Sequence, residues 1–271
     1  MFFEGIFSMK ISFSSTFLRN FSIIETLNRA KNIGYDGVEI WADHFYRQSD
    51  EPHSTKHKAK ELGLELTLHA PSYDLNPLSS NSGIAKESKR QIFDAIRLGE
   101  ELGAKLIVIH PGHFSSSQDT KDKFFPRLIE FAKEVSEFSK DIELQITFEM
   151  MEKRPKEFFQ TDDDAKRLMS QNIDGIGLTV DIAHLYTVGD EKEMLKSLNE
   201  EWIKHIHISD SGYGKTHLPL GEGEVDLVGA LKLLLKSFDG LLTIEAAILG
   251  RGEELVEKNF TYLNNLIKEM K

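Results

Sequence analysis

The chain has 271 residues and no cysteine, with 40% hydrophobic and 28% charged residues. This is the composition of a globular protein that can bury one large core. Without cysteine it has no disulfide, so any transition metal must be held by His, Asp and Glu, and we expect a cytoplasmic protein. The formal net charge of −11 opposes non-specific binding of polyanions, and no apolar run approaches the roughly 18 residues of a membrane span.

Apolar runs typical of buried strands alternate with helical segments along the whole chain. In the first half, strands are predicted at 10–14, 37–41, 64–70 and 105–110, with helices around 21–33, 53–62, 84–102 and 120–139. In the second half, strands are predicted at 144–149, 175–181, 202–209 and 241–246, with helices around 162–171, 191–199, 225–237 and 252–270. Eight strand–helix pairs without a linker predict an α/β fold, a single (β/α)8 barrel over residues 1–271. Residues 1–8 are expected to be an N-terminal or strand extension, or a mis-assigned start.

Six of the predicted strands end on residue types that bind metals. They are His69, His110, Glu149, Asp181, His207 and Glu245. The carboxyl ends of barrel strands form one rim, where barrel enzymes keep their chemistry, and unpartnered charges there would be costly. Three carboxylates with His207 favour an open catalytic site for a divalent cation (Mn, Zn, Mg or Co), and His69 and His110 could join Glu149 around a second ion.

Other polar residues are harder to place from the sequence. Glu39 lies in the predicted strand GVEIW, whose alternation turns it toward the barrel interior. We expect it either to orient a ligand or substrate at the rim or to form a buried salt bridge with Lys or Arg. His184 follows Asp181 by one turn and can reach the same pocket.

The remaining histidines are expected to be structural or solvated. His205 lies two residues before His207, deeper on the same face, and is expected to be a satisfied interior residue. His44, His53 and His57 occur in polar or helical surface contexts and are expected to be solvated.

Three motifs carry a resemblance that covers essentially the whole chain: VDIAH at 180–184, IHISD at 206–210 and HLPLGEGEVD at 217–226. With the strand-end residues, they resemble the xylose-isomerase-like barrel superfamily, which contains sugar isomerases, sugar epimerases and the endonuclease IV family. The resemblance implies that Glu149, Asp181, His207 and Glu245 are a shared set of metal ligands.

The sugar isomerases and epimerases imply one reading of the site. Glu149 and Glu245 would flank the reacting carbon and move its proton through an enediolate, with one or two divalent ions as cofactor. His184, Lys215 and His217 would bind the hydroxyls or phosphate of a sugar or sugar phosphate. A metal-dependent isomerase or epimerase is our first expectation, and a homo-oligomer is compatible with it.

Endonuclease IV implies a second reading, a metallo-phosphodiesterase that acts on abasic DNA. Its three-metal site would use His69 and His110 with a bridging Glu149, then the shared set, and finally His184, a loop Asp and His217. Lys215 stands where that Asp is expected, so a full three-metal site is not predicted. Nucleic acid is an expected partner only under this alternative. A non-catalytic metal- or sugar-binding barrel is a third alternative.

Overall fold

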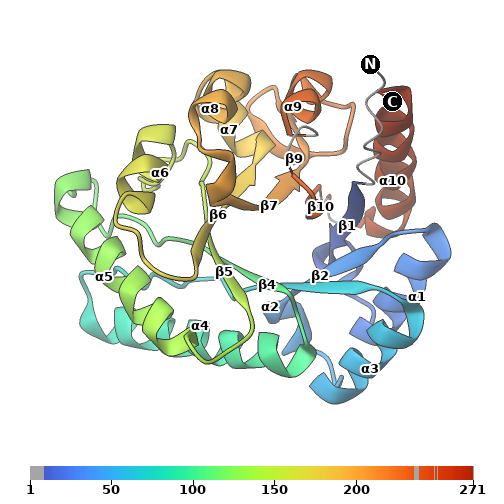
Figure 1. The fold of residues 1–271 in the computed structure, drawn as a ribbon, viewed down its shortest axis with the longest axis horizontal. Helices are drawn as coiled ribbons and strands as arrows, with labels where there is room; N and C mark the ends of the chain where they lie inside the picture. The colour runs from blue at the N-terminus through green and yellow to red at the C-terminus, as the bar shows by residue number, and fades with distance from the viewer. Residues whose placement is uncertain (1–8, 235–237, 247, 249, 271) are drawn as a thin grey trace.

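The computed structural model describes residues 9–234, 238–246, 248 and 250–270. In this part of the chain eight parallel strands form a closed barrel (Figure 1), in the order β1-β10-β7-β6-β5-β4-β3-β2. The strands are β1 (Lys10–Ser14), β2 (Gly37–Trp41), β3 (Glu65–His69), β4 (Leu106–Ile109), β5 (Gln145–Glu149), β6 (Ile176–Asp181), β7 (Ile203–Ile208) and β10 (Leu241–Ile244). The predicted (β/α)8 barrel is confirmed. Residues 1–8, and 235–237 of the predicted helix 225–237, lie outside the described residues.

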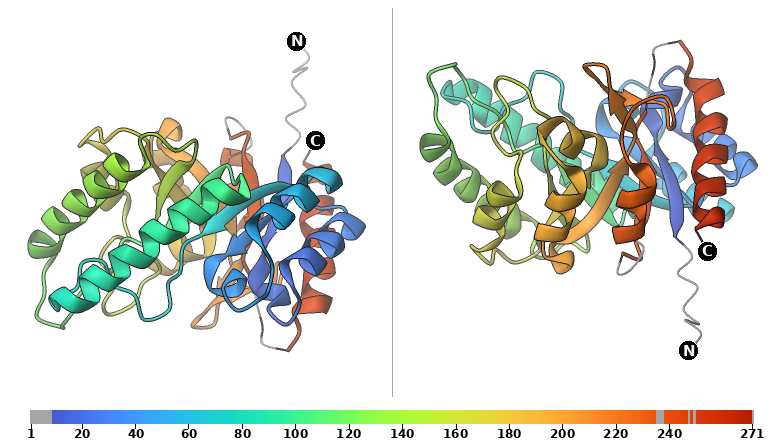
Figure 2. Two further views of the ribbon diagram at one scale, coloured as in Figure 1. Left: turned by 90° about the horizontal axis from the view of Figure 1, so that it is seen from below. Right: turned by 90° about the horizontal axis from the view of Figure 1, so that it is seen from above.

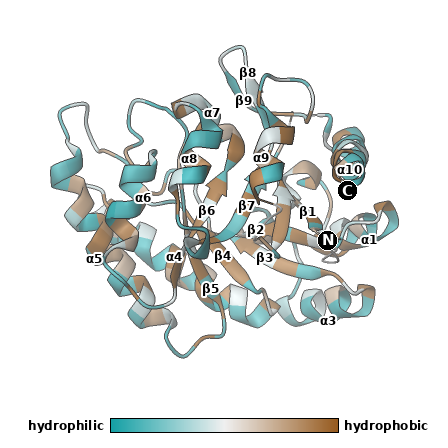
Figure 3. Cartoon of the chain, turned by 45° about the horizontal axis from the view of Figure 1, so that its top comes forward, coloured by the Kyte–Doolittle hydropathy of each residue, from teal (hydrophilic) through white to brown (hydrophobic). Residues whose placement is uncertain are grey.

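Helices cover the barrel on its outside, and their surfaces are hydrophilic where they face away from the strands (Figure 3). The helices that follow the strands are α1 (Ile23–Ile33), α3 (Pro52–Leu62), α4 (Ser82–Leu102), α5 (Lys121–Ser139), α6 (Asp162–Met169), α8 (Glu191–Ser197), α9 (Leu227–Leu234) and α10 (Gly252–Glu269). Helix α1 begins at a capping box between Ser22 and Glu25 and ends at Gly34, whose φ is 111°, a left-handed C-cap. Figure 2 shows α10 beside β1, so both ends of the described chain close the barrel.

Several short elements were not expected from the sequence, and all but one of them, a 3-10 turn that directly precedes β7, follow the carboxyl ends of strands. They are η1 (Ser15–Leu18), α2 (Ala42–Phe45), α7 (Ile182–Val188), η2 (Glu200–Trp202) and an antiparallel hairpin of β8 (Asp210–Gly212) and β9 (Lys215–Leu218). The hairpin projects beyond the barrel strands in Figure 3. Tyr213 and Gly214 connect its strands, both with positive φ, the conformation of a type I′ turn.

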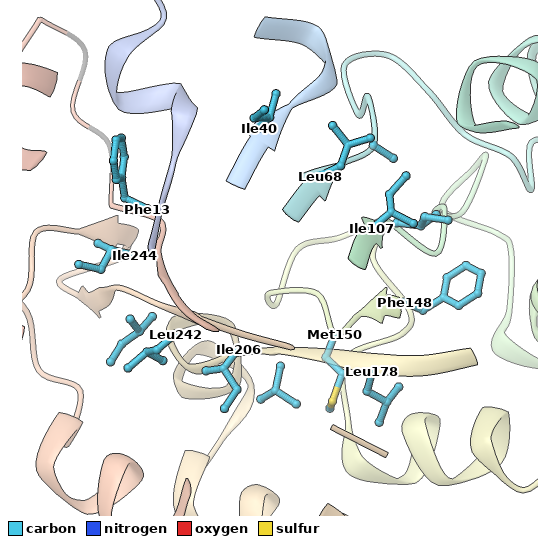
Figure 4. Packing of buried hydrophobic residues seen from close by; sticks show 14 of the residues in the cluster. Phe13, Ile40, Leu68, Ile107, Phe148, Met150, Leu178, Ile206, Leu242 and Ile244 are labelled. Carbon is cyan, nitrogen blue, oxygen red and sulfur yellow. The ribbon is translucent and has the colours of Figure 1, made fainter. Parts of the chain in front are cut away.

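The hydrophobic core lies between the strands and the helices. Figure 4 shows side chains such as Ile40, Leu68 and Leu242 arranged around the outside of the strand ring, and all three are fully buried. The alternate positions point into the barrel, and several of these are polar: Ser12, Glu39, Thr67, Thr147, Thr179, His205 and Thr243, all buried. Because buried polar groups need partners, the barrel interior is held by side-chain hydrogen bonds, such as Thr147 to Thr179 at 2.7 Å. Among the described helices none is long and apolar enough to cross a membrane.

Candidate metal centre

Four side chains from neighbouring strands converge at the carboxyl rim of the barrel. Glu149 and Asp181 end β5 and β6, His207 lies near the end of β7, and Glu245 follows β10 directly. One ligand atom from each lies within 4.8 Å of all the others. The first three are buried completely or almost so, and Glu245 keeps 9% of its surface exposed. The structure therefore brings together the four residues expected to bind the metal.

His207 is turned so that its two ring nitrogens have different surroundings. Its Nδ1 lies 2.9 Å from Glu245 Oε2 and 3.2 Å from Glu149 Oε1. Its Nε2 lies 3.0 Å from Glu39 Oε1. Burial lowers the pKa of His207, but the charges of Glu39, Glu245 and Glu149 raise that pKa well above its ordinary value. The carboxylates around His207 therefore strongly favour a positive charge at this position.

The oxygens of the centre fit a divalent cation. Glu149 Oε2 and Asp181 Oδ2 are buried and make no hydrogen bond to any described residue. Burial raises the pKa of Asp181, because charging an enclosed carboxyl is unfavourable without a counter-charge. A hard cation would pair with these oxygens, and carboxylates with one imidazole suit Mn, Mg, Co or an open zinc site.

A second group of possible ligands adjoins the first through Glu149. His69 Nε2 lies 3.5 Å and His110 Nε2 3.1 Å from Glu149 Oε2, and ligand atoms of the three residues lie within 4.8 Å of one another. The Nδ1 of His69 donates to the carbonyl of Ala70 at 2.7 Å, which leaves Nε2 facing the carboxylate. Both rings approach the same oxygen of Glu149, His110 lines the cavity of about 400 Å³, and an ion between the two rings stays a prediction.

A third group lies on the other side of Asp181. His184 and His217 approach each other with their Nε2 atoms 3.1 Å apart, and they form a possible ligand group with Asp181. Burial lowers the pKa of His184, but the charges of Asp181, Glu149 and Glu152 outweigh it and raise that pKa to about 9. His184 lines the same cavity as Glu149 and Glu245, as expected, and His217 lines it too.

Glu152 is a member of the site that the sequence did not reveal. It lies in the loop after β5, almost fully buried, with Oε2 3.5 Å from His184 Nε2 and Oε1 2.6 Å from Arg154 Nε. No motif marks it, since its position depends on how that loop folds back. His184 therefore has two carboxylate neighbours beside its Nε2, Glu152 at 3.5 Å and Asp181 at 3.8 Å.

The structure places Lys215 on β9, where it is exposed. It lines a cavity of about 980 Å³ together with Glu152, Arg154 and His217. A role in binding substrate stays a prediction for Lys215, as it does for His184 and His217.

Two expectations about individual residues are wrong. Glu39 does not reach the rim, because it is completely buried in the barrel interior and its partners are His205 and His207 rather than Lys or Arg. His44 is not solvated: it is buried, and its Nε2 donates to the carbonyl of Phe21 at 2.8 Å. His205 is interior and hydrogen-bonded, as expected.

The three groups open onto a cavity of about 400 Å³. Its wall includes Trp41, Tyr73, His110, Glu149, His217 and Glu245. The Trp41 ring stacks on His69 at a centroid distance of 4.4 Å, and the half-exposed Tyr73 lies against Trp41 at 5.7 Å. The cavity has the size of a small-molecule site and combines charged groups on its floor with an aromatic wall.

The fold and the site define a (β/α)8 barrel whose strand ends carry groups of potential metal ligands. Residues 27–266 match the family described as xylose isomerase-like TIM barrel. The chain belongs to this family, which confirms the resemblance seen in the sequence.

Proteins whose sequences are similar to this chain have been given different names. An uncharacterized protein of Methanocaldococcus jannaschii is 26% identical over 288 residues, covering 98% of this chain and 94% of the relative. A probable endonuclease 4 of Persephonella marina is 27% identical over 228 residues, covering 74% of this chain and 78% of the relative.

Solved structures share the barrel. A D-tagatose 3-epimerase-like protein is 23% identical with a TM-score of 0.79, covering 96% of this chain and 100% of its own. The IOLI protein with a binding zinc atom is 19% identical with a TM-score of 0.84, covering 96% and 99%. These likenesses concern the fold.

Proposed function

We propose that the protein is a divalent-metal-dependent isomerase or epimerase of a sugar or sugar phosphate. The observation that carries the proposal is the pairing of Glu149 and Glu245. Both carboxylates lie within 3.2 Å of the same His207 nitrogen on the floor of a cavity of about 400 Å³. Two carboxylates facing one small cavity are the groups needed to remove a proton from carbon and to return it.

In this proposal Glu149, Asp181, His207 and Glu245 hold the cation, which when bound stabilises negative charge on substrate oxygens. One of Glu149 and Glu245 removes a proton from the carbon beside a carbonyl. Return by the other carboxylate to the opposite face gives an epimer, whereas delivery to the adjacent carbon, with the hydroxyl proton passing from one substrate oxygen to the other, exchanges aldose and ketose. Trp41 packs against His69 on the cavity wall and limits the access of water, and His184, Lys215 and His217 bind substrate oxygens.

The test is deuterium exchange, because it detects proton removal even when the net conversion is small. Purified protein with Mn²⁺, Zn²⁺, Mg²⁺ or Co²⁺ is incubated in D₂O with a panel of ketoses, aldoses and their phosphates, and exchange at carbon is followed by NMR. Glu149→Gln and Glu245→Gln are each expected to reduce exchange by about 100-fold or more. Glu61→Gln, on the exposed end of α3, is the matched control. Absence of exchange with every sugar and metal would contradict the proposal.

A second function is favoured by a different observation. Three overlapping groups of possible ligands, around Glu149 and Asp181, lie at one rim, and an endonuclease IV-like phosphodiesterase would bind more than one ion there. The number of bound ions and cleavage of abasic-site DNA distinguish this function from the first. A non-catalytic metal- or sugar-binding barrel predicts tight binding without turnover of either substrate class.

A further inference from the structure

The barrel interior beneath the candidate metal centre contains a buried carboxylate between two imidazoles. Glu39 projects inward from β2, and His205 and His207 project inward from β7. These strands are not neighbours in the barrel, so the three side chains meet across its interior. All three are at most 1% exposed, so neither substrate nor solvent explains a charge at this position.

The two oxygens of Glu39 have separate partners. Oε2 accepts hydrogen bonds from His205 Nε2 at 2.8 Å and from Thr67 Oγ1 at 3.2 Å. Oε1 lies 3.0 Å from His207 Nε2, an ion-pair distance, and neither atom has a hydrogen-bond partner among the described residues. The carboxylate of Glu39 is therefore the polar group that faces His207 Nε2.

Because Glu39 is a carboxylate, it determines which ring nitrogen of His207 carries a proton. An ionised carboxylate only accepts hydrogen bonds, so the Nε2 that faces Glu39 carries a proton. In a ring with one proton, Nδ1 then has the free lone pair, and Nδ1 is the atom that faces Glu149 and Glu245.

We propose that Glu39 is a positioning residue that holds the proton on Nε2 of His207 and thereby presents Nδ1 to a divalent cation. The proposal rests on the metal centre of the proposed function, but it does not depend on which reaction the centre performs. Carboxylates behind metal-binding histidines fix the ring orientation and raise its basicity, and their loss typically lowers metal affinity about 10–100-fold.

Stability alone does not account for Glu39. Branched apolar side chains usually fill the interior of such barrels, and burying a charge with its partners is often less favourable than apolar packing. A polar network extends from His205, which also contacts Thr243 Oγ1 at 3.1 Å, and Thr243 contacts Ser12 Oγ at 2.5 Å. The carboxylate is thus maintained at an energetic cost directly behind a residue of the metal centre.

The test compares Glu39→Gln with Thr243→Val. The glutamine has the same shape, but its amide can offer an oxygen to only one imidazole, and an NH₂ group facing His207 would force the proton onto Nδ1. We expect the variant to bind Zn²⁺ or Co²⁺ about 10–100-fold more weakly in competition with a chelator. The Thr243→Val control lies in the same polar layer and touches His205 but not Glu39, so its affinity should stay within about threefold of wild type, below the effect of losing a carboxylate partner. Wild-type affinity in Glu39→Gln would overturn the proposal.

A measurement on wild type keeps the proposal testable even if Glu39→Gln does not fold. In the Zn²⁺-loaded protein, the ¹⁵N shifts of His207 should show a protonated Nε2 and a metal-bound Nδ1. A proton on Nδ1, or an ion bound directly by Glu39, would overturn it. If the tautomer and the affinities follow the expectation while no sugar exchanges deuterium, the role of Glu39 stands and the proposed function fails.

Discussion

Four histidines of the site each have one ring nitrogen directed at a fixed oxygen, and this contact sets the orientation of the ring. His69, His184 and His217 each direct Nδ1 at a backbone carbonyl, at 2.7, 2.9 and 3.0 Å. A carbonyl only accepts, so Nδ1 donates and Nε2 is left facing the site. His207 is reversed, with Nε2 toward Glu39 and Nδ1 toward the centre. Backbone carbonyls thus orient three of the five histidines in the three groups of possible ligands around Glu149 and Asp181, whereas His207 relies on the side chain of Glu39.

Glu157 permits a residue-scale prediction about pH. Burial, and then the charge of Glu152, raise the pKa of the Glu157 carboxyl to about 7. Because this pKa is raised above that of the unfolded chain, about 4.3, the associated stability is fully present below about pH 4 and is lost as the pH rises through about 7. Metal-free Glu157→Gln should therefore melt at the same temperature as wild type near pH 4 and about 5–10 °C higher at pH 8.

The measurement is thermal unfolding of both proteins across this pH range in a chelating buffer. Glu130→Gln, at an exposed position of α5, controls for the loss of one negative charge. An equal difference in melting temperature at both ends of the range would show that Glu157 does not titrate as described.

At the level of single residues, the sequence was sufficient to predict most of the site but not which side chains contact one another. The strand-end positions of His69, Glu149 and Asp181 followed from counting along each strand. The alternation in β2 also turned Glu39 inward correctly. Its partner His205 lies 166 residues away on a strand across the barrel, and no local pattern contains that pairing. Glu152 was missed because it sits in a loop, where periodicity is absent.

At the scale of elements, the packing of α10 on η1 depends on a glycine. A Cβ built on Gly252 would lie 1.7 Å from the carbonyl oxygen of Phe17, and the backbone of η1 cannot move aside as a flexible side chain can. Gly252→Ala should displace the start of α10 and lower the free energy of unfolding by about 1–3 kcal/mol or more, as measured by denaturant titration.

Gly83→Ala is the matched control for this element. It also lies in the first turn of a long helix, α4, but a Cβ there would meet only the side-chain oxygen of Asn81, at 3.3 Å. Its effect should stay within about 0.5 kcal/mol of zero. Equal effects of the two substitutions would mean that the contact with Phe17 does not restrict α10.

Long elements were predictable from the sequence, and short ones were not. All eight barrel strands appeared at their predicted places because each is a run of apolar β-type residues bounded by polar segments. α2 and α7 have only 4 and 7 residues, too few to show a helical period. The β8–β9 hairpin was read as a loop because its two strands contain 3 and 4 residues and are polar.

At the scale of the whole molecule, we expect the acidic centre to couple metal binding to folding. Glu149, Asp181 and Glu245 are held within 4.8 Å of each other and of His207, and a ligand that binds only the folded state stabilises it. At about 100 times the dissociation constant the gain is about 2.7 kcal/mol, or about 5–10 °C in melting temperature. Chelation by EDTA should remove this increment from wild type but have little effect on Asp181→Asn, and an unchanged wild-type melting temperature would contradict the metal site.

We expect Lys215 to discriminate between the two proposed reactions. In β9 it lies two residues before His217, and both side chains line the cavity of about 980 Å³. An ammonium has no lone pair to give a metal and repels a cation nearby. Although Glu152 adds a carboxylate beside His184, one of its oxygens is paired with Arg154. We therefore expect wild type to bind at most two ions and not to cleave abasic-site DNA.

The experiment measures metal content and DNA cleavage for wild type, Lys215→Asp and Lys215→Met. Lys215→Asp supplies an oxygen ligand, whereas Lys215→Met only removes the charge. A third ion in the Asp variant alone shows that a ligand is lacking, because loss of repulsion would appear in both. A third ion in both variants shows that the ammonium excludes it. Three ions and robust cleavage in wild type would instead defeat the isomerase proposal, since His184, His217 and Asp181 would then complete a nuclease centre without a carboxylate at position 215.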